Sequence, residues 1–418
     1  MKKLSTFVLL FAAASTLALG VTSCKPDEEE TTDKQYADRS YGTAAIDACD
    51  ALINQLNAAT EKVMRSKLTD AQTTALREVV RNDVENVIIP TYTRLADAAE
   101  ALQQALGDLS AGEIKQANID AACKAFKEAR AWWEKSEAFL GGAASDFDID
   151  PTIDSWPLNR DLLLHYFQTG KYTDEALEDA SILGFHALEF VLFRDGRNRT
   201  VAEFQKNDTY KGFTSVPAAE ELRYAQAVAR ELVTRCSQLQ VSWELSPNLN
   251  RLASVTKAGL DYQTKNGKSF GWNMMNAGSA GSTFDSLIDA VQQILNDDEG
   301  SCAAIADEVG SGKIGNPFAS GYIFYVESPY SYNSIADFQD NIRSIENIWY
   351  GSTDGSRKPA ANSFYQWFKD NDSATGDKVA KAIKDAISAI GAMPYPFVKY
   401  VSTIWNKPFE DDAVVDIE

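Results

Sequence analysis

The stretch LGFHALE, residues 183 to 189, combines a strong helical signal with the most distinctive chemistry of this chain. It places His186, one of only two histidines, three residues before Glu189. On a helix this spacing puts both side chains on one face, with Cβ atoms about 5 to 6 Å apart. Such a pair can bind a metal ion or form a hydrogen bond, although the same spacing also arises by chance on solvated helices. Gly184 costs a helix about 1 kcal/mol against alanine, so we expect another segment to pack closely against the backbone there.

Helical periodicity extends outward from this stretch over most of the chain, and few segments alternate as strands do. We therefore predict an all-α protein. In the first half the apolar spacing predicts helices at 41–66, 69–107 (kinked or split at Pro90), 112–140, 158–169 and 174–193. In the second half it predicts helices at 216–241, 247–265, 281–297, 300–309, 335–350, 360–370, 375–391 and 394–405.

The predicted helices fall into two groups, separated by a polar segment at residues 194–215. We predict two helical-bundle domains, residues 40–205 and 206–418, and a weak internal echo between them suggests duplication. Residues 143–156 are expected to form an acidic loop. The segment from Gly310 to Tyr332 is too long for a turn between bundle helices and is interpreted as a functional or packing loop.

The N-terminus has the pattern of a lipoprotein signal peptide over residues 1–23. Lys2 and Lys3 precede an apolar run, and small residues lead up to Cys24. Cys24 would become the lipidated first residue, joined to the bundles by an acidic tether at residues 24–39. We therefore expect a cell-envelope protein that is lipid-anchored to the outer membrane through Cys24, on its periplasmic or surface-exposed face.

The charge balance limits the partners of this protein. It has 60 Asp and Glu residues against 40 Lys and Arg residues, which gives a net charge of -20. This charge argues against nucleic acid as a binding partner, whereas cationic partners, including metal ions, remain plausible. The remaining cysteines are Cys49, Cys123, Cys236 and Cys302. They show no CxxC spacing and make a poor zinc site. Four cysteines allow three disulfide pairings, and the sequence does not choose among them.

Five segments then resemble, in order, the signature motifs of the imelysin-like family. They are VIIPTYTRLA at residues 87–96, a W-x-x-S-E segment with a following glycine at Trp133, Ser136, Glu137 and Gly141, a W-P at Trp156 and Pro157, a G-x-H-x-x-E at Gly184, His186 and Glu189, and a pattern ending in Y-G at residues 338–351. The resemblance covers most of residues 40–405. It implies two helical bundles, a role in iron uptake, and a binding region at the G-x-H-x-x-E helix between the two halves.

The family also carries a peptidase label, which the residues do not favour. A zincin needs H-E-x-x-H, and here Ala187 follows His186; the inverted H-x-x-E-H would need a histidine where Phe190 stands. The only other histidine, His165, is expected to be a satisfied or surface residue. We favour a non-catalytic binder and keep two alternatives: a metallopeptidase, and a peptide- or glycan-binding surface lipoprotein using the aromatic residues Tyr322, Phe324, Tyr325, Tyr330 and Tyr332.

The candidate site combines these motifs. His186, Glu189 and Glu137 are the predicted metal ligands, since one imidazole with two carboxylates suits iron or manganese better than a structural zinc. The other candidate ligand-binding residues are Gly184, Trp133, Ser136 and Trp156, with Asp154 as an orienting group. Core packing is the competing interpretation for the tryptophans, and a solvated helix face for Glu137. Iron is the expected ligand, with haem, an iron chelate or docking on an iron-transport partner protein as alternatives.

Overall fold

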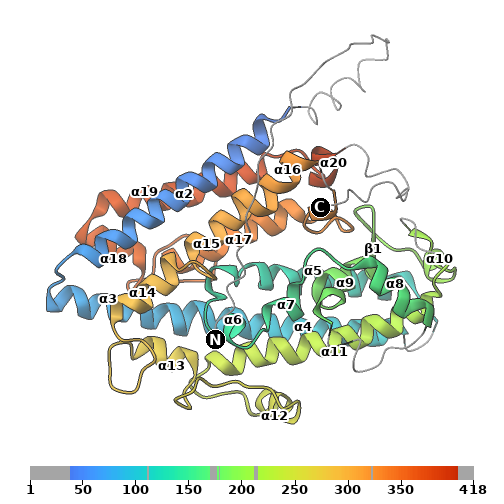
Figure 1. The fold of residues 1–418 in the computed structure, drawn as a ribbon, viewed down its shortest axis with the longest axis horizontal. Helices are drawn as coiled ribbons and strands as arrows, with labels where there is room; N and C mark the ends of the chain where they lie inside the picture. Colours follow the sequence, from blue (N-terminus) through green and yellow to red (C-terminus); the bar gives the residue numbers. More distant parts are fainter. Residues whose placement is uncertain are drawn as a thin grey trace, which may run out of the picture.

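The computed structural model describes residues 38–110, 113–169, 177, 179–210, 215–321 and 323–402. The described residues confirm the all-α prediction, because they are helical apart from loops and one short antiparallel hairpin, β1 (Phe193–Arg194) with β2 (Arg197–Asn198). Figure 1 shows α2 (Ser40–Arg65) and α19 (Ser373–Gly391) along one side of the molecule, and α4 (Ile89–Ser110) and α11 (Ala218–Trp243) along the other. The signal peptide, Cys24 and most of the tether lie outside the described residues.

The predicted helix over 69–107 divides near Pro90, as expected. It consists of α3 (Asp70–Asp83), a π-helical turn η1 (Val84–Ile88) and α4. Thr69 caps α3 by accepting a hydrogen bond from the Gln72 amide at 3.2 Å. The π-helical turn lies directly before Pro90, whose missing N–H interrupts regular α-helical hydrogen bonding.

The elements around LGFHALE are shorter than predicted. After α5 (Gln116–Glu134) come η2 (Glu137–Phe139), α6 (Ala143–Asp146), α7 (Asp150–Asp154), α8 (Arg160–Thr169), η4 (Ala180–Ile182), α9 (Gly184–Leu192) and α10 (Val201–Phe204). The expected acidic loop at 143–156 therefore contains two short helices. In the described residues the helix predicted from 174 begins only at Gly184, because Leu183 has an extended backbone. Every residue of α9 is buried, so this helix runs through the interior.

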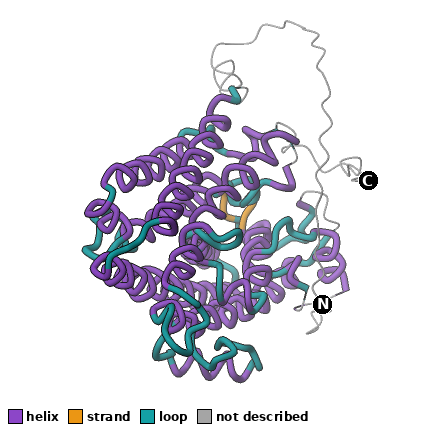
Figure 2. The backbone as a smooth tube through the Cα atoms, turned by 60° about the vertical axis from the view of Figure 1, so that its left-hand side comes forward, coloured by secondary structure: helices purple, strands orange, loops and turns teal. Residues whose placement is uncertain are grey.

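The second half continues with further helices. They are α12 (Leu249–Lys257), α13 (Phe270–Met275), α14 (Leu287–Asn296), α15 (Cys302–Asp307), the π-helix η6 (Glu308–Gly315), α16 (Asn316–Ser320), η7 (Ile323–Tyr325), α17 (Ser334–Tyr350), α18 (Phe364–Asn371) and α20 (Phe397–Val401), besides α11 and α19. The segment interpreted as a loop from Gly310 thus begins as a π-helix. Figure 2 shows the two short strands near the middle of the molecule, with helices around them and loops beside them.

Helices from the two halves of the sequence pack against each other. The first helix, α2, packs against α19, α14, α15 and η6 of the second half, whereas α11 packs against α4 and α9 of the first. The buried apolar residues form one cluster that runs through both. The division into domains at residue 205 stays a prediction, while the packing crosses that boundary at both α2 and α11.

Two further findings concern the described residues. None of their helices is both long and apolar enough to cross a membrane. The four cysteines at positions 49, 123, 236 and 302 are buried free thiols, so the structure uses none of the three pairings that the sequence allows. Burial raises the pKa of Cys49 and of Cys123 to about 12, which keeps both as unreactive thiols.

Candidate metal centre

The N-terminus of α9 lies directly against α7. Gly184 has φ +72°, and a Cβ placed on it would lie 2.0 Å from the carbonyl oxygen of Ile153. Only glycine allows both this backbone conformation and this approach. The close packing predicted at Gly184 is confirmed, and it brings Asp154, the last residue of α7, beside His186.

His186 meets two carboxylates from distant segments. Its Nε2 lies 3.0 Å from Oδ1 of Asp154 and 2.9 Å from Oε1 of Glu327. The three residues offer ligand atoms that all lie within 4.8 Å of one another. Although the carboxylates are close, Nε2 has no aligned hydrogen-bond partner among the described residues. One imidazole nitrogen and two carboxylate oxygens converging in this way form a ligand set suited to iron or manganese.

Glu189 contacts the other side of the imidazole. Its Oε2 lies 3.7 Å from Nδ1 of His186, while its Oε1 accepts hydrogen bonds from the amides of Tyr330 (3.0 Å) and Ser331 (2.7 Å) and from Oγ of Ser331 (2.7 Å). Glu189 thus ties α9 to the segment that carries Glu327. A carboxylate hydrogen-bonded to the far nitrogen of a metal-binding histidine orients the ring. Glu189 lies on that side of the imidazole, at a distance longer than a hydrogen bond.

Arg130 and two tryptophans hold the cluster in place. The buried guanidinium of Arg130, on α5, contacts the carboxylates of Asp154, Glu327 and Glu134. Trp133 Nε1 donates a hydrogen bond to Oδ2 of Asp154 at 2.7 Å. The Trp156 ring covers the imidazole of His186, with a centroid separation of 4.2 Å. These contacts fix the carboxylates before any ligand arrives.

The charged groups of this cluster shift the pKa values of one another. Burial alone would lower the pKa of His186, but the carboxylates of Glu327 and Asp154 outweigh it and raise the pKa well above its usual value. Burial opposes ionisation of Glu327 too, yet Lys313, His186 and Arg130 lower its pKa to about 2. Without a metal ion, a proton on His186 therefore balances the carboxylates. A cation at Nε2 would replace that proton.

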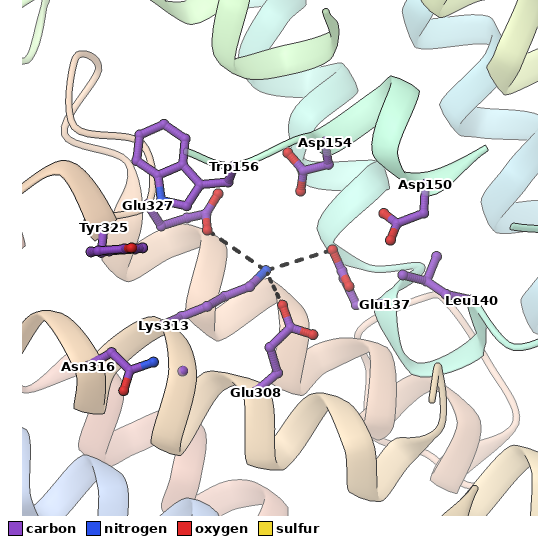
Figure 3. A pocket seen from close by; sticks show the side chains of 11 residues that line it. Glu137, Leu140, Asp150, Asp154, Trp156, Glu308, Lys313, Asn316, Tyr325 and Glu327 are labelled. Carbon is purple, nitrogen blue, oxygen red and sulfur yellow. Dashed lines mark ion pairs between the residues drawn. The ribbon is translucent and has the colours of Figure 1, made fainter. Parts of the chain in front are cut away.

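A pocket of about 290 Å³ opens beside the cluster, between η2, α7 and η6. Figure 3 shows Lys313 reaching into it among Glu137, Glu308 and Glu327. Burial raises the pKa of Glu137 well above its usual range, and that of Asp150, on the same wall, to about 7. The pocket is thus lined by more carboxylates than its one lysine can balance.

The predicted site residues fall in three places. His186 is part of the cluster. The residues beside it are Gly184, Glu189, Trp133 and Trp156, as described above. Glu137 lies in the adjoining pocket, 3.8 Å from Nζ of Lys313 rather than in the cluster. Ser136 is buried at the end of α5, where its Oγ donates a hydrogen bond to the carbonyl of Trp133 at 2.6 Å.

The structure also shows the positions of His165 and of most aromatic residues of the alternative peptide- or glycan-binding surface. His165 is exposed on α8, in agreement with the surface interpretation. Tyr330 and Tyr332 are buried, and Tyr330 packs edge-on against Phe190 at 5.1 Å, whereas Tyr325 lines the pocket. Tyr322 and the side chain of Phe324 lie outside the described residues.

Reasoning from the sequence missed five site residues: Arg130, Glu134, Glu308, Lys313 and Glu327. Arg130 lies three residues before Trp133, on the same helix face, so the W-x-x-S-E segment offered a signal for it. Lys313 and Glu327 lie in the segment already interpreted as functional or packing. No spacing relates them to His186, because they come from far along the chain.

The family model described as imelysin matches residues 88–413, so this chain belongs to the imelysin family. Iron-regulated protein A of Synechococcus elongatus is 25% identical over 328 residues, which cover 78% of each protein. A crystal structure described as that of an iron-regulated protein A precursor from Parabacteroides distasonis is 24% identical, with a TM-score of 0.60, and the match covers 81% of this chain and 97% of that one. This second likeness shows the fold.

Proposed function

We propose that this protein binds iron for uptake and performs no catalysis, and that the ion sits at His186, Asp154 and Glu327. The observation that carries the proposal is the buried Nε2 of His186, which has carboxylate oxygens from two other segments of the chain at 2.9 and 3.0 Å. A metal ion that replaces the proton on Nε2 could be shared by both carboxylates. The printed name of the Synechococcus relative, iron-regulated protein A, supports iron as the metal.

The pocket size favours a bare ion or a small chelate over haem. Its volume of about 290 Å³ lies at the lower end of the roughly 300–1,000 Å³ typical of ligand pockets. Catalysis receives no support from the sequence around His186, which has neither an H-E-x-x-H nor an H-x-x-E-H motif.

The test is metal binding by the purified protein. Binding of Fe(II), Fe(III), Mn(II) and Zn(II) is measured by calorimetry, and the bound metal is quantified by metal analysis. We expect one ion per chain, with binding lost in His186→Ala and in Glu327→Gln at matched folding by circular dichroism. His165→Ala is the control, since it removes the exposed histidine. Wild-type protein that binds none of the four ions would refute the direct-ligand proposal.

Attachment to the outer membrane through lipidated Cys24 is part of the proposal and rests on the sequence pattern alone. Cys24→Ala should move the protein from the membrane fraction to the soluble fraction without changing metal binding. An unchanged distribution would contradict the anchor. A transport partner protein should then be recovered by crosslinking in iron-starved cells expressing the anchored form, and not from cells expressing the Cys24→Ala variant.

A further inference from the structure

Lys313 places a positive charge at the centre of a cage of carboxylates. Its Nζ lies 3.4 Å from Glu308, 3.8 Å from Glu137, 3.9 Å from Glu134 and 4.0 Å from Oε2 of Glu327. Charge-assisted N–H···O hydrogen bonds are about 2.7–2.9 Å long, so the ammonium sits between these groups without a close bond to any of them. Its side chain is only 10% exposed. The cage therefore surrounds the ammonium of Lys313 without a short ion pair to any one carboxylate.

Glu327 belongs to both regions. Its Oε1 lies 2.9 Å from Nε2 of His186, and its Oε2 faces the ammonium of Lys313. A carboxylate that presents one oxygen to each of two neighbouring cation positions is the arrangement of two-metal sites, whose ions lie about 3.5–4 Å apart. The His186 cluster and the cage thus share the Glu327 carboxylate.

We propose that the cage around Lys313 is a second cation subsite, formed by Glu137, Glu308 and Oε2 of Glu327, which the Lys313 ammonium fills so that the protein takes up a single metal ion. The subsite would take a divalent cation, because its ligands are carboxylate oxygens. The role of Lys313 as a determinant of stoichiometry rests on the proposed function of the neighbouring His186 cluster.

The local structure would let an ion enter the cage once the ammonium is removed. Lys313 lies in the π-helix η6, and π-helical turns are frequent at functional sites. Its flexible stem carries a compact charge with rotatable donors, unlike the planar fork of Arg130. Glu308 is about half exposed and forms the solvent side of the cage, so a hydrated ion can reach the subsite there.

The test is the stoichiometry of Mn(II) binding by the purified full-length protein, measured by calorimetry and electron paramagnetic resonance. We expect wild type to bind one uncoupled ion and Lys313→Met to bind two ions with the spectrum of a spin-coupled pair. Lys313→Arg, which keeps the charge, should still bind one. Adding Glu137→Gln to Lys313→Met should remove the second ion.

The outcomes separate this inference from the proposed function. One ion in both wild type and Lys313→Met would overturn the subsite and leave the His186 site intact. No ion in wild type but one in Lys313→Met would support the subsite and refute the His186 site, and no ion in either would refute both. If Lys313→Met does not fold by circular dichroism, Lys313→Gln, which keeps a polar group in the cage, is measured against the same outcomes.

Discussion

The His186 cluster and the Lys313 cage are both buried and acidic, yet their charges are held differently. In the cluster, Arg130 is in direct contact with Asp154 and Glu327, and Trp133 adds a hydrogen bond. In the cage, the nearest carboxylate lies 3.4 Å from Nζ of Lys313 and the others lie farther away. Close pairing fixes the carboxylates of the cluster, whereas the ammonium of Lys313 is shared by several carboxylates of the cage at longer distances.

The largest expected effect comes from removing the cation that organises the cluster. Arg130→Met should lower the free energy of unfolding by roughly 3–5 kcal/mol, because breaking a buried ion pair leaves uncompensated carboxylates. Urea denaturation measures it, with the exposed Arg65→Met as control. Lys313→Met should cost clearly less; an equal cost for Lys313→Met and Arg130→Met would show that the two regions are held alike.

The contact between α7 and α9 provides the next test. Gly184→Ala should cost roughly 3 kcal/mol, because a positive φ and a clash with Ile153 both oppose a side chain there. It should also separate Asp154 from His186 and weaken metal binding, which calorimetry would detect. Gly107→Ala in α4 is the matched control, since nothing lies within 4 Å of its added Cβ. Unchanged metal affinity in folded Gly184→Ala would show that this contact does not position the cluster.

The pH dependence of the metal-free protein should report the proton on His186. Its pKa is raised by Glu327 and Asp154 despite burial, so its stabilising effect is complete below the unfolded pKa near 6.5 and is lost as pH rises toward the folded pKa. Stability should therefore fall above pH 6.5, by at most about 1.4 kcal/mol per pH unit from this group.

Denaturation of wild type and His186→Gln between pH 6 and 9 isolates this contribution, with His165→Gln as control. Metal affinity should rise over the same range, because the ion displaces a proton. A wild-type profile parallel to that of His186→Gln would contradict a raised pKa for this histidine.

The smallest expected effect comes from the hydrogen bond between Trp133 and Asp154. Trp133→Phe removes the donor that holds Oδ2 at 2.7 Å, and should cost about 1 kcal/mol because Arg130 still pairs with the carboxylate. Metal affinity should fall only slightly, as measured by calorimetry. Trp132→Phe, on the outer face of α5, serves as control. Complete loss of binding in Trp133→Phe would show that orientation of Asp154 matters more than its pairing with Arg130.

The sequence predicted part of this site for clear physical reasons. The i, i+3 spacing correctly placed His186 and Glu189 on one helix. The close contact predicted at Gly184 is confirmed, although this glycine is the first residue of α9 and has a positive φ rather than lying inside the helix. It could not show that the two side chains have different partners, since Glu189 is engaged by Tyr330 and Ser331 while His186 faces Glu327. No motif or spacing in the sequence marked Glu327 as a site residue.

By itself, the sequence determined the helical class, the family and the position of the G-x-H-x-x-E helix, because apolar periodicity and short motifs are properties of neighbouring residues. Only the tertiary structure decided which charges meet. Arg130, Asp154, His186 and Glu327 come from α5, α7, α9 and the segment after η7. Their pairing and pKa shifts depend on burial and on partners far along the chain, which local spacing does not encode.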